Sequence, residues 1–183
     1  MRDIKQEILH FWFEETTPAL WFQKNEQFDQ HIRERFLSAY KLAAEGVCDS
    51  WRDDADGCVA LCVVLDQFPR NMFRGTQAAF ATDARALNIA RFAISRGFDQ
   101  TLSVARRRFL YLPFEHSEDM ADQERALALF KSIAAEDRLA YDYAVRHYDV
   151  IARYGRFPHR NAILGRKNTP EEEEYLAQPG AGF

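Results

Sequence analysis

The chain has 183 residues, of which 47% are hydrophobic and 14% aromatic, so it carries enough apolar material for the core of one compact domain. Its formal net charge of −4 excludes the strongly basic surface of a nucleic-acid-binding protein. No polybasic tract and no apolar run near the ~20 residues of a membrane span are present, so we expect no membrane contact. We predict a single domain over residues 1–183, with residues 178–183 as a frayed tail.

The cysteines indicate whether the protein belongs in a reducing or an oxidising compartment. Cys48, Cys58 and Cys62 are odd in number, and no pair forms a Cys-x-x-Cys motif. Cys58 and Cys62 lie four residues apart in an apolar stretch, which is typical of small core residues in a reducing environment. The first residues also lack the pattern of a secretory signal, so we expect a cytoplasmic protein.

Hydrophobic periodicity predicts three helices in the first part of the chain. The first covers about residues 2–13, with apolar side chains at helical spacing. The second runs from Asn25, a good N-cap, to Gly46, a good C-cap. The third, about residues 54–66, is apolar on all sides, which indicates a central, buried helix.

Capping residues and prolines delimit the later helices. We expect a helix from about residue 75 to 96 closed by Gly97, and a shorter one from 102 that stops at 112 before Pro113. Ser117 is the predicted N-cap of the next helix. A helix over about residues 137–154 ends at Gly155, and Thr169 begins the last one with a capping-box pattern.

These segments predict an all-α protein. Seven or eight helices with short connections are expected to pack as antiparallel pairs. The sequence has no convincing thirty-four-residue repeat and no tetratricopeptide consensus.

Three short polar motifs fall where predicted helices should stop. The first signature is Leu65-Asp-Gln-Phe-Pro-Arg-Asn71, the second is Leu112-Pro-Phe-Glu-His-Ser-Glu-Asp119, and the third is Gly155-Arg-Phe-Pro-His-Arg-Asn161. Each combines proline and phenylalanine with charged or amide side chains, whereas an ordinary turn uses Gly, Ser or Asn. We therefore predict a site assembled from helix ends.

Opposite charges gather in two of these turn regions. Residues 115–122 hold four acidic side chains and no Lys or Arg, and residues 153–166 hold four arginines and no acid. One interpretation is that the two regions pair and fix how helices dock. The other is that some Arg and His side chains face a pocket and bind a carboxylate or phosphate.

Histidines beside carboxylates are candidates for general acid–base catalysis. His116 or His159 is a candidate general base, with Glu115 or Asp66 as the group that orients it. Asp66 follows an apolar stretch, so we expect its pKa to rise unless Arg70 or another cation approaches.

Metal and cofactor motifs are weak. Glu7-x-x-His10 has the spacing of half a di-iron motif, but no second copy exists. His147, on the apolar face of its helix, is better interpreted as a core histidine than as a ligand. We therefore predict no metal and no cofactor.

The three signatures, with Asn71-Met-Phe-Arg-Gly75 and Tyr111-Leu-Pro-Phe114, resemble a bacterial family catalogued as domain of unknown function 924. The resemblance extends from His10-Phe-Trp-Phe13 to Thr169-Pro-Glu-Glu172. It implies an all-α fold similar to tetratricopeptide-repeat proteins, with helix pairs in a right-handed superhelical stack. The family brings no established catalytic roles.

Three functions stay open on these grounds. We favour a binding module whose Arg- and His-containing pocket takes a small anionic molecule or a peptide, with no nucleic-acid or membrane partner. The alternatives are a hydrolase that uses Glu115, His116 and Asp66, and a structural hub of ion pairs. The predicted ligand-binding residues are Gln67, Arg70, Asn71, Glu118, Asp119, Arg156, His159, Arg160 and Asn161. The oligomeric state is not predicted.

Overall fold

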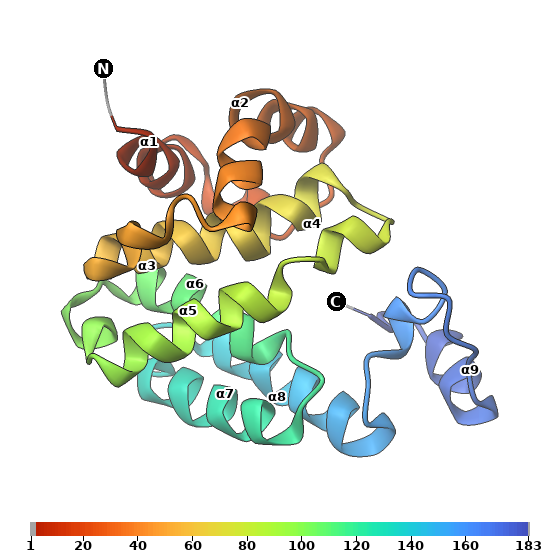
Figure 1. Cartoon of the computed structure of the whole chain (residues 1–183). Helices are drawn as coiled ribbons and strands as arrows, with labels where there is room; N and C mark the ends of the chain where they lie inside the picture. Colours follow the sequence, from red (N-terminus) through yellow and green to blue (C-terminus); the bar gives the residue numbers. More distant parts are fainter. Residues whose placement is uncertain (1–2, 183) are drawn as a thin grey trace. The chain divides into compact units, whose positions relative to one another are not determined.

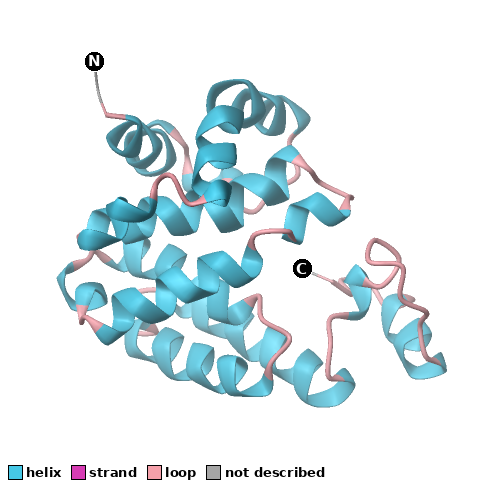
Figure 2. Ribbon diagram, in the orientation of Figure 1, coloured by secondary structure: helices cyan, strands magenta, loops and turns pink. Residues whose placement is uncertain are grey.

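The fold is all-α, as predicted. The structure is a computed structural model that describes residues 3–182, and in this range helices are joined by loops without any β-strand (Figure 2). Contacts divide the chain into two compact units. The first unit holds the residues up to Arg74 together with Ala78–Pro113, and the second holds Gly75–Gln77 and the residues from Phe114 onward. Folding as a single domain stays a prediction.

The first two helices begin and end close to where their capping residues predict. Helix α1 (Ile4–His10) continues into a π-helical turn over Phe11–Glu15. Helix α2 (Glu26–Glu45) begins after Asn25, whose side chain accepts a backbone N–H of the first turn. It ends at Gly46, whose φ of 90° lies in the left-handed region that glycine adopts without strain.

The apolar third helix is buried, as predicted, but it does not stop at the first signature. Helix α3 (Ala55–Cys62) passes through a π-helical turn over Val63–Gln67 into α4 (Phe68–Met72), so the prediction of a helix end here is wrong (Figure 1). The π turn is closed by the Phe68 N–H, which donates to the carbonyl of Val63, five residues earlier.

Pro69 is tolerated inside the helix because another donor replaces the N–H group that proline lacks. In a regular helix, the N–H of residue 69 would bond to the carbonyl of Leu65, and proline has no N–H. The hydroxyl of Thr82 instead donates to that carbonyl at 2.5 Å. The buried polar group is therefore satisfied from a neighbouring segment.

Aromatic side chains fill the core of the first unit. Trp12, fully buried, meets Phe68 edge-on at 5.6 Å and Phe109 at 5.5 Å between ring centroids. Phe36 of α2 stacks on Phe68 at 4.9 Å. Edge-to-face and offset contacts of this kind stabilise a core beyond simple area burial.

Two predicted boundaries in the middle of the chain are wrong. The helix expected from residue 75 begins only with α5 (Asp83–Ser95), after a 3-10 turn over Gln77–Phe80. Helix α6 (Val104–Glu115) runs through Pro113 and ends two residues later. A proline near a helix end removes one backbone hydrogen bond, which the last turn tolerates better than a helix centre.

The second unit is built on two helices that pack side by side, α7 (Met120–Ile133) and α8 (Arg138–Tyr154) (Figure 1). Asp119 caps α7, accepting the N–H groups of the first turn, so the prediction of Ser117 as cap is wrong by two residues. Ser117 instead donates its hydroxyl to a carboxylate oxygen of Asp122 at 2.7 Å. Helix α8 ends at Gly155, as predicted.

The chain ends with a short, well-capped helix. Helix α9 (Pro170–Leu176) has the predicted capping box between Thr169 and Glu172. The tail beyond it, predicted to fray, makes several hydrogen bonds. Arg146 donates to the Gly180 carbonyl and the Gly182 N–H donates to the Tyr175 hydroxyl, both at 3.3 Å. The Ala181 N–H donates to the carbonyl of Gln178 at 3.1 Å. Phe183 lies outside the described residues.

No helix within residues 3–182 is both long enough and apolar enough to cross a bilayer.

Candidate functional site

The first signature forms a partly buried ion-pair network inside the first unit. Asp66, 1% exposed, accepts a hydrogen bond from Gln67 Nε2 at 2.6 Å and lies 3.2 Å from Arg70 Nη1. Arg70 also holds both oxygens of Asp83, at 2.8 and 2.9 Å. Burial lowers the pKa of Arg70, but the charges of Asp66 and Asp83 outweigh it and raise that pKa overall. The expected approach of Arg70 to Asp66 is confirmed.

The same signature also ties α4 to α2. Asn71 Nδ2 donates to Asp29 Oδ1 at 2.7 Å, and Arg74 holds both oxygens of Asp29 at 2.7 and 2.9 Å. The side chains predicted to bind a ligand, Gln67, Arg70 and Asn71, thus have protein partners in the first unit. These contacts favour a structural role for the first signature, and the catalytic role of Asp66 stays a prediction.

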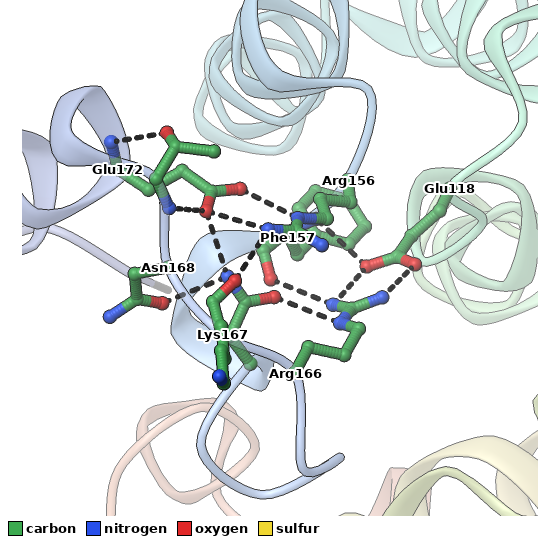
Figure 3. Close-up of polar contacts among 9 residues, drawn as sticks. Glu118, Arg156, Phe157, Arg166, Lys167, Asn168 and Glu172 are labelled. Atoms are coloured by element: carbon green, nitrogen blue, oxygen red, sulfur yellow. Dashed lines mark hydrogen bonds and ion pairs between the residues drawn. The ribbon is translucent and has the colours of Figure 1, made fainter.

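The second and third signatures meet in the second unit through Glu118, which lies just before α7. Figure 3 shows Arg166 reaching both of its carboxylate oxygens, at 2.7 and 2.9 Å, while the N–H of Phe157 donates to one of them at 2.8 Å. Burial raises the pKa of Glu118, but these donors outweigh burial and lower it overall. This pair is the kind of contact that the charge-pairing interpretation predicts.

Glu172 of α9 is the second acidic centre of this network (Figure 3). Arg156 contacts both of its oxygens, at 2.6 and 2.8 Å, and Asn161 Nδ2 donates to one at 3.1 Å. Hydrogen bonding by Arg156 lowers the pKa of Glu172 to about 2. The sequence placed Glu172 in a capping box and did not identify it as the partner of Arg156, because this pairing depends on how the chain folds back after α8.

Several predicted ligand-binding residues are therefore part of the fold of the second unit. Arg156 and Asn161 hold Glu172, Glu118 holds Arg166, and Asp119 caps α7. These contacts favour structural roles for the four side chains, because each one fixes the position of a neighbouring segment.

A second group of side chains, here called the histidine cluster, consists of Glu115, His116 and His147. One metal-ligating atom from each residue lies within 4.8 Å of the other two. Glu115 is the last residue of α6 and His116 follows it, while His147 comes from α8. Glu115 and His147 are 3% and 5% exposed, and His116 is partly exposed.

The geometry of His147 fixes its tautomer. Its Nδ1 lies 2.8 Å from the carbonyl of Tyr143, which can only accept, so Nδ1 carries the proton. Glu115 Oε1 is 3.2 Å from the same nitrogen. Burial, followed by the charge of His116, lowers the pKa of His147 well below its usual value, so the imidazole is neutral at pH 7.

Arg160 and His159 of the third signature border the histidine cluster. Arg160, 7% exposed, donates to the carbonyl of His116 at 3.1 Å. Its guanidinium lies 4.5 Å from the ring centroid of Phe157, which is 5.6 Å from the ring of His147. His159 lies 5.6 Å from the same phenylalanine ring. Of the predicted site residues, Glu115, His116, His159 and Arg160 thus come together in the second unit.

His147 is the residue of this group that sequence analysis did not place in a site. It is a buried histidine with a satisfied Nδ1, as predicted, but it also lies beside Glu115 and His116. Its position on the apolar face of α8 was visible in the sequence, while its neighbours on other segments were not.

The all-α fold and the three signatures point to a family of bacterial helical proteins. The chain belongs to the family described as bacterial protein of unknown function (DUF924), whose model matches residues 8–180. It is also similar to a solved structure from Agrobacterium tumefaciens, of a protein of unknown function. That similarity has 44% sequence identity and a TM-score of 0.91, over 96% of this chain and 98% of the other. No curated protein matches the chain.

Proposed function

We propose that the chain is a binding protein for a small anionic molecule, held in the second unit beside the histidine cluster. The observation that carries this proposal is the grouping of Arg160, His116 and His159 around the buried ring of His147. Arg160 donates to the carbonyl of His116 at 3.1 Å and lies over Phe157, which also contacts His147 and His159. Basic side chains gathered at one place favour the binding of an anion.

Arg160 and His116 are the side chains best suited to hold the anion. The arginine offers a planar set of N–H donors, which matches a carboxylate or a phosphate. The imidazole of His116 is partly exposed and lies 6.2 Å from that of His147, between ring centroids. The ligand class supported by this donor set is a small carboxylate or phosphate, in agreement with the expectation from the sequence.

The test is thermal unfolding of the purified protein with a panel of phosphates and carboxylates. A ligand present at one hundred times its Kd adds about 2.7 kcal/mol, which for a chain of this length raises Tm by about 5–10 °C. We expect the shift to be lost in Arg160→Gln and His116→Ala. Arg138→Ala, an exposed arginine on α8, is the matched control and should keep it. A wild-type protein that none of these anions stabilises would contradict the proposal.

A hydrolytic function is the second candidate, favoured by the 3.2 Å approach of Glu115 Oε1 to His147 Nδ1. A carboxylate beside an imidazole is a common arrangement in general acid–base catalysis. In this arrangement His147 takes the place that the sequence assigned to His116 or His159. Turnover of simple aryl esters or phosphates that is lost in Glu115→Gln would favour this candidate over simple binding.

We also propose a tetratricopeptide-like superhelical arrangement of the helices and a cytoplasmic location. The cysteines, all free and buried, support a reducing compartment. Burial raises the pKa of Cys58 to about 12, so its thiol stays protonated and unreactive at neutral pH.

A further inference from the structure

We propose that Glu115, His116 and His147 form a binding site for one divalent transition-metal ion of the zinc class. One ligand atom from each side chain lies within 4.8 Å of the other two, although His147 comes from a different helix than the adjacent Glu115 and His116. Two of the three are almost fully buried, which distinguishes them from the exposed acidic groups common on protein surfaces. The proposal goes beyond anion binding and stands on this geometry alone.

The end of α6 explains how two adjacent residues face the same point. Successive side chains of an α-helix point about 100° apart, so neighbours inside a helix cannot converge. Glu115 is the last residue of α6, and His116 already belongs to the turn that follows. The change of backbone direction there lets both side chains approach His147.

The donor set suits zinc. Two imidazoles and one carboxylate are the three protein ligands of a well-known kind of zinc site, which leaves a fourth position for water or another ligand. The Nδ1–H of His147 donates to the carbonyl of Tyr143, which leaves the lone pair on Nε2. A backbone carbonyl that orients a ligating histidine in this way is a usual feature of metal sites.

The three ligand atoms lie farther apart than they would around a bound zinc ion. Zinc lies about 2.0–2.2 Å from nitrogen and oxygen ligands, so tetrahedral donors are about 3.3 Å apart. The three ligand atoms must therefore approach one another from at most 4.8 Å to about 3.3 Å. Glu115 Oε1 lies 3.2 Å from Nδ1 of His147, so on metal binding its carboxylate also turns from the Nδ1 side of the ring toward Nε2.

The surrounding charge favours a metal that carries an anion. Glu115 supplies one negative charge, and Arg160 supplies a positive charge against the backbone of His116. A divalent ion held by one carboxylate keeps excess positive charge, and Arg160 adds to it. An anionic group in the open coordination position offsets both, which links this site to the ligand class proposed above.

The experiment is a calorimetric titration of untagged, chelator-stripped protein with Zn²⁺. We expect one ion per chain, and at least tenfold weaker binding in Glu115→Gln and in His116→Ala. His10→Ala is the matched control, because His10 lies beside Glu14 and Glu15 on the surface of the first unit and should not contribute. Circular dichroism checks that each variant is folded.

A second measurement needs no variant. In wild-type protein labelled with ¹⁵N-histidine, Zn²⁺ should shift the ring-nitrogen resonances of His116 and His147 and leave those of His10, His31 and His159 in place. Binding that moves only the latter histidines, survives in both cluster variants, or is absent altogether would overturn the proposal. Titrating phosphate into metal-free protein separates the two proposals, because anion binding there can succeed while metal binding fails, and the reverse.

Discussion

The hydroxyl of Thr82 donates to the Leu65 carbonyl, whose regular α-helical partner would be the N–H that Pro69 lacks. Pro69 cannot bond to Leu65, and Thr82 donates to the Leu65 carbonyl at 2.5 Å in a buried position. Removing the donor of a buried carbonyl destabilises the fold by the free energy of desolvating that carbonyl. The tolerance of proline inside this helix therefore depends on a residue outside the signature.

We expect Thr82→Val, which keeps the shape and removes the hydroxyl, to lower the free energy of unfolding by about 1–3 kcal/mol. Urea denaturation measures the change. Thr101→Val is the control, because that hydroxyl bonds to the Phe98 carbonyl at an exposed turn and its loss should cost less than about 0.5 kcal/mol. Equal effects of the two substitutions would show that the Leu65 carbonyl is not the critical partner.

The lowered pKa of Glu172 leads us to expect that the stability of the protein depends on pH. Its pKa falls from 4.5 to about 2 in the folded chain, chiefly through Arg156. A lowered pKa means that the folded state favours the charged carboxylate, so its stabilisation is present above about pH 4.5 and is lost as the pH falls toward 2. Tm should therefore drop between these pH values more steeply in wild type than in Glu172→Gln. Glu174→Gln, on the same helix, should keep the wild-type slope.

Local chemistry predicted the ends of several helices. Asn25 with Gly46, Gly155, and the Thr169 capping box lie where the sequence placed them, because a cap depends on a few consecutive residues. The cap of α7 was missed because Ser117 and Asp119 are both good caps two residues apart, and Ser117 bonds to Asp122 instead.

The two prolines inside helices show where local chemistry is insufficient. The sequence gives the cost of Pro69 and Pro113 in a helix, and helix ends were predicted there for that reason. It does not show the π-helical turn before Pro69 or the hydroxyl that reaches Leu65 from another segment. Such compensation depends on tertiary packing, which overrides local preference.

Glu118 and Arg166 join α7 to the loop after the third signature, and we expect them to be energetically coupled. A double-mutant cycle with Glu118→Gln and Arg166→Ala should give a coupling free energy of about 1–2 kcal/mol, because the pair is bidentate and partly buried. Arg138 and Asp142, an exposed pair within α8, should couple by less than about 0.5 kcal/mol. Similar coupling in both cycles would argue against a special role for Glu118.

At the scale of the whole molecule, the fold class and the family could be predicted from the sequence, while the pairs of residues in contact could not. The all-α class follows from periodicity along the chain, and the family follows from motifs within it. The contacts of the candidate site join residues far apart in sequence, such as Glu115 with His147 and Glu118 with Arg166. No local pattern specifies such pairs, so the sequence identified several residues of the site but missed His147 and did not show how the residues group.

The similarity to the Agrobacterium protein bears on how this architecture is maintained. More than half of the aligned positions differ, since identity is 44%, yet the TM-score is 0.91. Cores tolerate many substitutions when volume and pattern are kept. A backbone this similar at this level of sequence change indicates that the helical framework tolerates many substitutions.

The π-helical turn before α4 sets the rotational register of α4 relative to α3. A turn closed over five residues contains one residue more than an α-helical turn, and each residue advances a helix by about 100°. Deleting one residue from Val63–Gln67 would therefore restore a regular helix and rotate α4 by that angle. Asn71 would then turn away from Asp29 on α2, so a single inserted residue determines which face of α4 meets its neighbour.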